Sequence, residues 1–207
     1  MTDRTAHILQ NITAISPDDW NHCANPAGDE YNPFLDHRFL RALEESGSAA
    51  AETGWQPFHL CLKEAKTTVG VVPIYLKSHS RGEYVFDSGW ADAFYRAGGD
   101  YYPKMQVSVP FTPATGRRLL VSDSPKRDQI EEQLLHSLVQ VAKQIKVSSL
   151  HLTFLPKAQW DRAGKFGMLQ RMDTQFHWRN NGYDTFEKFL EDLSSKKRKN
   201  IRRERRG

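Results

Sequence analysis

Two carboxylates, Glu83 and Asp87, lie four positions apart in the string RGEYVFDS at residues 81–88. We expect this stretch to form a strand, in which the side chains at positions 83, 85 and 87 share one face. Carboxylates arranged in this way can line a cleft and accept the proton of a reacting amine. The alternative is a solvated edge strand, because charged side chains are mostly exposed. The spacing is therefore compatible with acid–base chemistry or with a plain surface.

Two later loops supply further polar and aromatic side chains. Tyr101, Tyr102 and Lys104 lie in a proline-containing loop after Gly98 and Gly99, and such loops commonly carry binding residues. A second loop covers residues 110–117. We therefore predict a substrate groove whose polar groups are Glu83, Asp87, Tyr101, Tyr102, Lys104, Thr112 and Arg117.

The histidines and cysteines give weaker signals. His37, His79 and His177 can titrate near neutral pH, but a lone histidine is more often a hydrogen-bonded structural residue than a catalyst. We expect His177 to lie near an interface and to contribute to substrate binding there. Cys23 and Cys61 are isolated, and no His, Cys and Asp spacing resembles a zinc site, so no metal is predicted.

The elements that must position these residues follow an alternating pattern. Ser16 and Pro17 are typical of an N-cap and of the first residue of a helix. Trp90 and Phe94 lie four residues apart, so we expect them to pack in the core from a short helix. Strands are expected at 7–15, 56–63, 67–77, 84–86, 105–109, 118–121, 150–155 and 168–178, and helices at 35–45, 90–97, 125–146, from 156, and at 184–195. This order predicts an α/β (α+β) fold, a mixed sheet flanked by helices.

Composition places the chain among ordinary globular proteins. Of its 207 residues, 39% are hydrophobic and 26% are charged, which excludes a disordered chain. The N-terminus has no apolar segment behind a basic start, and the longest apolar run is too short to cross a bilayer. Two cysteines without a secretory signal are typical of reduced thiols. We therefore predict a cytoplasmic protein without a membrane span.

Positive charge is concentrated in one stretch near the C-terminus. Residues 196–206 contain eight Lys or Arg and one Glu, which is a net charge of +7. The whole chain carries +4, so the remainder carries −3. We consider three interpretations of this basic arm: a solvated helix that leads to a further domain, an RNA-phosphate contact, or a membrane-surface contact. The arm lacks interleaved aromatic residues and an apolar face, so the linker is favoured.

Several strings together resemble a known family. They are NPFLDHRFL (32–40), HSRGEYVFD (79–87), YYPK (101–104), PFTPATGR (110–117), QFHW (175–178) and KKRKNIRRER (196–205). In this order they resemble the FemAB-like N-acyltransferases of bacteria, a branch of the GNAT superfamily. The resemblance extends from about residue 32 to residue 206.

The resemblance implies an activity and a domain plan. Family members are similar to a duplicated GNAT fold of nearly twice this length, so residues 1–182 are expected to be an N-terminal GNAT-like domain. Residues 183–207 would then be an amphipathic and basic helix that leads to a C-terminal half. The implied activity of the whole protein is transfer of an acyl or aminoacyl group to a small-molecule or peptide amine, in peptidoglycan-related metabolism. This half alone is expected to be inactive. The alternative function is a non-catalytic RNA-phosphate-binding module, with tRNA as a partner.

The same resemblance raises the question of the acyl donor. A GNAT site for acyl-CoA needs backbone N–H groups that hold a pyrophosphate directly before a helix. The candidate loop, 112–118, contains one glycine, Gly116, and a strand-like stretch separates it from the next helix. We expect no cofactor site in this half, with acyl-CoA or aminoacyl-tRNA as the donor of the full-length protein. Direct phosphate binding by Arg117 or Arg118 is the alternative.

Overall fold

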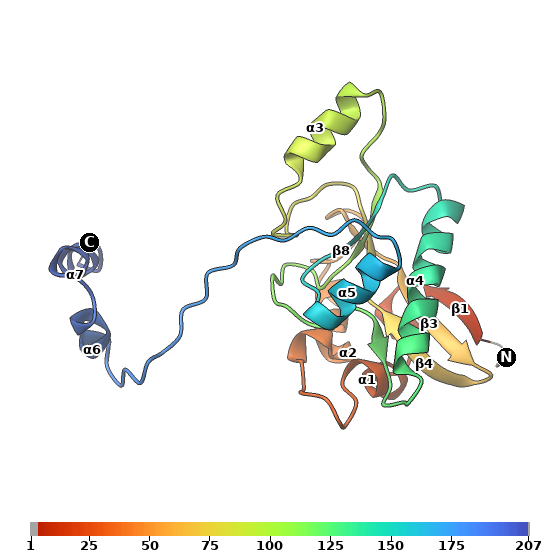
Figure 1. Ribbon diagram of the computed structural model, residues 1–207, viewed down its shortest axis with the longest axis horizontal. Coiled ribbons are helices and arrows are strands. Elements are labelled where there is room, and N and C mark those ends of the chain that lie inside the picture. The colour runs from red at the N-terminus through yellow and green to blue at the C-terminus, as the bar shows by residue number, and fades with distance from the viewer. Residues whose placement is uncertain (1–3, 207) are drawn as a thin grey trace. The chain divides into compact units, whose positions relative to one another are not determined.

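The computed structural model describes residues 4–206 and divides into two compact units, Met1–Gln170 and Arg171–Gly207. The elements of the first unit, coloured along the chain in Figure 1, are β1 (Arg4–Leu9), α1 (Pro17–Ala24), α2 (His37–Glu45), β2 (Trp55–Pro57), β3 (His59–Glu64), β4 (Thr67–Val72), β5 (Ile74–Lys77), α3 (Ser88–Arg96), β6 (Lys104–Val107), β7 (Leu120–Val121), α4 (Arg127–Gln144), β8 (Leu150–Leu152) and α5 (Lys157–Lys165). Short 3-10 turns occupy Ile12–Ala14 and Pro33–Leu35.

The strands form two sheets of four. The first sheet has the order β1-β3-β4-β7 and is antiparallel throughout, and the second has the order β2-β5-β6-β8, with β6 and β8 parallel. Only Phe58 separates β2 from β3, and only Pro73 separates β4 from β5. Proline has no N–H for the ladder, so a strand tends to break or bend there. The segment 55–64 therefore passes from the second sheet into the first, and the segment 67–77 passes from the first sheet into the second.

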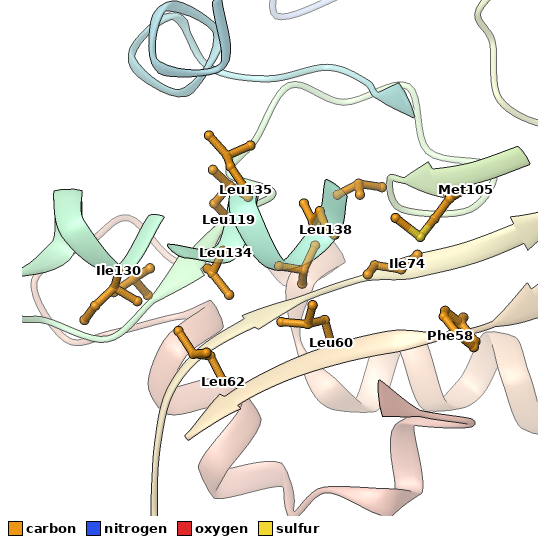
Figure 2. Packing of buried hydrophobic residues seen from close by; sticks show 13 residues of the cluster. Phe58, Leu60, Leu62, Ile74, Met105, Leu119, Ile130, Leu134, Leu135 and Leu138 are labelled. Carbon is orange, nitrogen blue, oxygen red and sulfur yellow. The ribbon is translucent and has the colours of Figure 1, made fainter. Parts of the chain in front are cut away.

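A single apolar core joins the two sheets to α4. Leu60 and Leu62 of β3 and Met105 of β6 point toward Leu134 and Leu138 of α4 (Figure 2). All five side chains are buried. Burying a leucine side chain stabilises a fold by about 1.5–3 kcal/mol, so this cluster is the main source of stability. The helix predicted over 125–146 is present as α4, and its buried leucines face this core.

The opposite face of the first sheet is covered by α1 and α2. Trp20 and Leu40 from these helices pack with Cys61, Val71 and Leu120 of the sheet. Helix α1 begins as the sequence predicts, because the Ser16 side chain accepts a hydrogen bond from the Asp19 N–H and Pro17 is the first helical residue. The first sheet is therefore enclosed by helices on both faces.

Two strand predictions are wrong, and the strand predicted at 7–15 is wrong beyond Leu9, because Ile12–Ala14 form a 3-10 turn. Residues 84–86 are not a strand, and Tyr84 has a φ of +56°, which an extended strand does not allow. Residues 168–178, also predicted to be a strand, have no strand partner among residues 4–206. A sequence pattern alone does not make a strand, because the backbone groups also need a neighbouring ladder.

The second unit contains two short helices, α6 (Phe186–Glu191) and α7 (Ser195–Glu204). The Thr185 side chain caps α6 by accepting a hydrogen bond from the Lys188 N–H. Helix α7 carries most of the basic arm and has no buried residue. The expected helix at 184–195 is therefore interrupted before Ser195, where the basic helix begins separately. Among the described residues, none of the helices has the length and hydropathy needed to cross a membrane.

Candidate functional site

The second sheet has one apolar and one polar face. On β6, Met105 and Val107 point into the core, while Lys104 and Gln106 lie on the other side. Strand pairing extends this polar face to both neighbours: Lys77 of β5 is opposite Lys104, and His151 of β8 is opposite Gln106. A buried polar row on three strands is unusual, since buried polar groups must be paired to avoid a desolvation cost.

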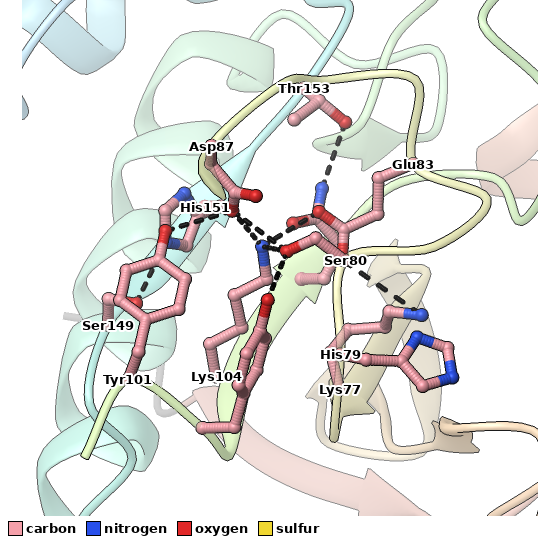
Figure 3. A network of polar contacts seen from close by, with 12 residues as sticks. Lys77, His79, Ser80, Glu83, Asp87, Tyr101, Lys104, Ser149, His151 and Thr153 are labelled. Atoms are coloured by element: carbon pink, nitrogen blue, oxygen red, sulfur yellow. Dashed lines mark hydrogen bonds and ion pairs between the residues drawn. The ribbon is translucent and has the colours of Figure 1, made fainter. Parts of the chain in front are cut away.

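Lys104 is the centre of a polar network (Figure 3). Its Nζ, which is fully buried, donates to Glu83 Oε2 at 2.8 Å, to Asp87 Oδ2 at 2.5 Å and to Ser80 Oγ at 2.8 Å. Three acceptors saturate the three N–H groups of an ammonium. Glu83 lies in the loop after β5 and Asp87 is the N-cap residue of α3, so the loop itself brings both carboxylates to the lysine.

Two tyrosines complete the network. Tyr101 OH donates to Asp87 Oδ2 at 2.9 Å, and Tyr102 OH shares a hydrogen bond of 2.7 Å with Ser80 Oγ. Both rings lie close to the Lys104 ammonium, with centroids at 5.4 and 5.8 Å. Burial, followed by the hydrogen bond to Asp87, raises the pKa of Tyr101. The Tyr101 phenol therefore stays protonated and acts as a donor.

The two carboxylates have pKa values that move in opposite directions. Burial raises the pKa of Glu83, although Lys104 and Lys77 oppose this. Burial also acts to raise the pKa of Asp87, but the donors Lys104 and Ser80 outweigh it, so that the pKa is lowered. Glu83 Oε1 has no hydrogen-bond partner among residues 4–206. Acids whose environments separate their pKa values are the usual basis of acid and base roles.

Lys77 lies on the same face with much poorer contacts. Its Nζ is fully buried, 3.3 Å from the Arg81 carbonyl oxygen, 3.9 Å from Glu83 Oε1 and 3.4 Å from the centre of the Trp55 ring. Burial lowers the pKa of Lys77 to about 7, against the attraction of Glu83. A lysine with this pKa is partly neutral at physiological pH.

His151 borders the network on β8. Its Nε2 shares a hydrogen bond of 2.8 Å with Ser149 Oγ, and its ring lies edge-on to Tyr101 at 6.2 Å. Burial, followed by the charge of Lys104, lowers the pKa of His151 to about 4, while Asp87 opposes this. The imidazole is therefore neutral at pH 7 and can accept or donate a hydrogen bond on the polar face.

Five of the eight predicted site residues come together in this network: Glu83, Asp87, Tyr101, Tyr102 and Lys104. Glu83 and Asp87 were expected either to line a cleft from a strand or to lie on a solvated edge strand. Neither alternative is correct, because the two acids lie on no strand and both are buried. The expected core packing of Trp90 and Phe94 is wrong, since these side chains are 65% and 43% exposed.

The other three predicted residues lie elsewhere. Thr112 Oγ1 donates to the Pro110 carbonyl in its own loop. Arg117 donates to the Ala24 carbonyl and pairs with Asp29 at 3.0 Å, so it fastens loops together. His177 belongs to the second unit, where it is exposed and contacts Gln175 Oε1 at 2.9 Å.

Sequence reasoning missed Lys77, Ser80 and His151. The available signal for Lys77 and Lys104 was a lysine at the end of a mostly apolar strand, which places an amine where the strand should be buried. Ser80 and His151 carry no comparable signal, because they reach the network only through the tertiary fold. Among residues 4–206, no cluster of His, Cys, Asp or Glu is arranged to hold a metal ion.

A family model for FemAB-like proteins, described as peptidoglycan biosynthesis/recognition, matches residues 11–207. The chain belongs to this family. No curated protein matches it. The residues that match the FemAB-like model include both the Lys104 network and the basic arm at residues 196–206.

Solved structures show the fold of this FemAB-like chain. A predicted acetyltransferase from Clostridium acetobutylicum, solved with acetyl-CoA, has a TM-score of 0.50 and 13% identity, with 88% of this chain and 100% of that chain covered. A ribosomal-protein-alanine N-acetyltransferase from Brucella melitensis has a TM-score of 0.45 and 14% identity, covering 86% and 99%. An aminoglycoside N-acetyltransferase in complex with CoA has a TM-score of 0.49 and 11% identity, with 86% of this chain and 95% of that chain covered. The fold is that of the GNAT acetyltransferases, which confirms the predicted fold class.

Proposed function

We propose that this FemAB-like protein is an N-acyltransferase that transfers an acyl group to an amine of a peptidoglycan-related acceptor. The family and the GNAT fold support an acyl-transfer role. The observation that carries the proposal further is the pair Glu83 and Asp87 on Lys104, with one carboxylate oxygen of Glu83 left without a hydrogen bond. Acyl transfer to an amine needs a base of this kind, because the attacking nitrogen must lose a proton.

In the proposed reaction Glu83 is the general base. The acceptor nitrogen forms a bond to the acyl carbon, the bond from that carbon to the donor breaks, and the nitrogen gives its proton to Glu83 Oε1. Lys104 holds the other oxygen of Glu83 at 2.8 Å and so fixes the carboxylate. Lys77, 3.9 Å from Oε1, is placed to take the proton onward. Asp87, Tyr101 and Tyr102 are positioning residues for Lys104.

The donor that we propose is acyl-CoA, which supplies an activated thioester. The loop at 112–118 does not fit its phosphates, because Arg118 is buried and donates to the carbonyls of Ala114, Gly116 and Arg117. The N-terminus of α4 is the better candidate: its N-cap residue, Lys126, is exposed and makes no side-chain cap, whereas Arg127 already pairs with Asp29 at 3.2 Å and the Lys126 N–H donates to Ser124 Oγ. A helix N-terminus with free N–H groups favours a phosphate.

The N-terminal-half hypothesis remains part of the proposal. Residues 1–182 would form a GNAT-like half, and residues 183–207 would lead to a second half. Large apolar side chains in the segment before α6, Met172 and Phe176, are 82% and 97% exposed, as expected of a surface that another part of a protein covers. On this hypothesis His177, from the same segment, contributes at that junction, and Thr112 and Arg117 border the groove.

One assay tests the reaction. The protein is incubated with radiolabelled acetyl-CoA and amine acceptors, among them lysine-containing muropeptides, and acylated products are identified by mass spectrometry. We expect Glu83→Gln to lower kcat by about 10²–10⁴, as for loss of a general base, with KM little changed. Glu52→Gln, an exposed carboxylate on another loop, is the matched control and should keep full activity. Equal kcat for Glu83→Gln and the wild type would contradict the proposal.

Calorimetry with coenzyme A tests the donor site. Micromolar affinity that falls in Lys126→Gln would support binding at α4. Absence of binding would favour the expectation from the sequence that this half has no donor site, or an aminoacyl-tRNA donor.

The basic helix supports a second candidate function, an RNA-phosphate-binding module. Helix α7 has no buried residue and most of its cations are exposed, although Arg202 pairs with Glu187, and Arg205 stacks on Phe186 at 4.1 Å. Filter binding to tRNA against salt concentration distinguishes this module from the linker. A steep salt dependence that disappears on deletion of residues 196–206 would favour RNA binding, since each neutralised phosphate releases counterions.

A further inference from the structure

A pocket of about 600 Å³ lies behind Trp55, on whose ring the Lys77 ammonium rests. Its apolar walls come from Leu43, Trp55 and Phe111, and two nitrogen-bearing side chains, His79 and Arg81, complete it. Trp55 and Phe111 pack on one another with ring centroids 5.3 Å apart. The proposed acyl transfer assigns no role to this pocket.

Two glycines shape the pocket walls. A Cβ at Gly54 would lie 2.5 Å from His79 Nε2, and a Cβ at Gly82 would lie 2.6 Å from the Phe111 ring. Both glycines have positive φ values, +72° and +79°. Phe111 itself has a φ of +57°, and its N–H donates to the Gly82 carbonyl at 3.2 Å. Strained backbone that is held in place in this way concentrates at functional sites.

The charge of the pocket is positive. Arg81 is exposed, and no carboxylate among residues 4–206 pairs with its guanidinium. Lys77 Nζ lies 3.4 Å from the centre of the Trp55 ring, which lines the pocket. Burial lowers the pKa of His79, and the charges of Lys77 and Arg81 lower it further. Burial is the larger cause of this shift, and the positive charge of Arg81 beside the pocket is what would attract an anion.

We propose that this pocket binds the carboxylate of the acceptor, which is therefore an amino acid or peptide rather than a polycationic amine. The carboxylate pairs with Arg81, whose planar guanidinium matches it in a bidentate way, and an apolar side chain lies against Phe111 and Leu43. The assignment to the acceptor rests on the proposed function. The existence of a carboxylate site does not.

Binding without any acyl donor tests the site. N-acetyl-L-phenylalanine and its neutral amide are compared by calorimetry on the wild type, Arg81→Gln and Arg96→Gln. We expect the acid to bind at least about tenfold more tightly than the amide, and Arg81→Gln to abolish this preference, because a charge-assisted pair is lost. Arg96, an exposed arginine on α3, is the matched control and should keep the preference. The pKa of His79, followed by NMR, should rise when the anion binds.

Two results would overturn the site: equal affinity for acid and amide, or an unchanged preference in a folded Arg81→Gln protein. A turnover assay separates the site from the reaction by comparing L-phenylalanine with phenethylamine, which lacks the carboxylate. Turnover of both amines with equal kcat/KM would reject the carboxylate site and leave the acyltransferase intact. Binding of the acid without turnover of any amine would reject the acyltransferase and leave the site.

Discussion

Lys77 and Lys104 face each other on neighbouring strands, and both ammonium groups are fully buried. Lys104 has three oxygen acceptors within 2.8 Å, whereas Lys77 has one carbonyl oxygen at 3.3 Å and an aromatic ring. The same residue type on the same face therefore has two different roles. A saturated lysine fixes its partners, while a poorly satisfied one can change its protonation state.

Glu83 connects the two lysines. One of its oxygens accepts from Lys104, and the other is turned toward Lys77 without a hydrogen bond. The carboxylate is thus fixed by Lys104 at one oxygen, while the other oxygen is buried and accepts no hydrogen bond. This asymmetry is what makes Glu83, rather than Asp87, the proposed base, since Asp87 receives donors from Lys104, Ser80 and Tyr101.

The largest effect is expected from Lys104→Met. Removing the ammonium leaves two buried carboxylates without their cation, which should lower the free energy of unfolding by about 3–5 kcal/mol. Urea denaturation measures this. The control adds Glu83→Gln and Asp87→Asn to Lys104→Met, which removes the uncompensated charge and should restore a large part of the loss. A loss that stays the same in the triple variant would mean that packing, not charge, explains the role of Lys104.

The charge of Lys104 should also affect the pKa of His151 and, through it, the pH dependence of stability. The pKa of His151 is lowered from 6.5 to about 4 in the folded protein, so between these pH values only the unfolded chain binds the proton. Folded stability should therefore fall as the pH falls from 6.5 to 4, by at most about 3 kcal/mol for this group. Urea denaturation of the wild type and His151→Gln across this range isolates the contribution. Parallel pH profiles would show that burial and Lys104 do not lower the pKa.

The sequence predicted the core better than the site. The α4 stripe and the Ser16 cap depend on local periodicity and capping, which are readable along the chain. The pairing of Glu83 with Lys104 depends on a loop that carries Glu83 and Asp87 over the end of β6. The predicted residues Glu83, Asp87 and Lys104 lie together, but the strand predicted for the two acids is wrong, because the attraction of two acids to a buried lysine is a tertiary effect.

The exposed aromatic residues of α3 are a second case in which the tertiary structure, and not the local sequence, decides whether a side chain is buried. Trp90 and Phe94 have the spacing of a buried helix face, yet only Ala91 of α3 is buried. Spacing shows that side chains share a face, and does not show that another element covers it. The strand predicted at 168–178 is wrong for the same reason, since no strand among the described residues pairs with this segment.

The smallest effect on stability at neutral pH is expected from Lys77→Met. A methionine of similar volume replaces an amine whose contacts are poor, so the free energy of unfolding should change by less than about 1.5 kcal/mol. The contrast with Lys104→Met, which alters the same residue type one strand away, is the sharpest test of the comparison. Equal losses in the two variants would show that both lysines are structural.

The pH dependence of Lys77→Met sharpens the comparison further. The pKa of Lys77 is lowered from 10.5 to about 7 in the folded protein, so between these values the unfolded chain holds a proton that the folded protein lacks. This group therefore makes the wild type more stable as the pH rises from 7 toward 10.5, and the methionine variant should lack that rise. Because a proton acceptor near neutral pH is also what the proposed reaction needs beside Glu83, Lys77→Met should reduce kcat while leaving the fold intact. A variant with normal kcat and no change in the pH profile would leave Lys77 without a role in proton transfer.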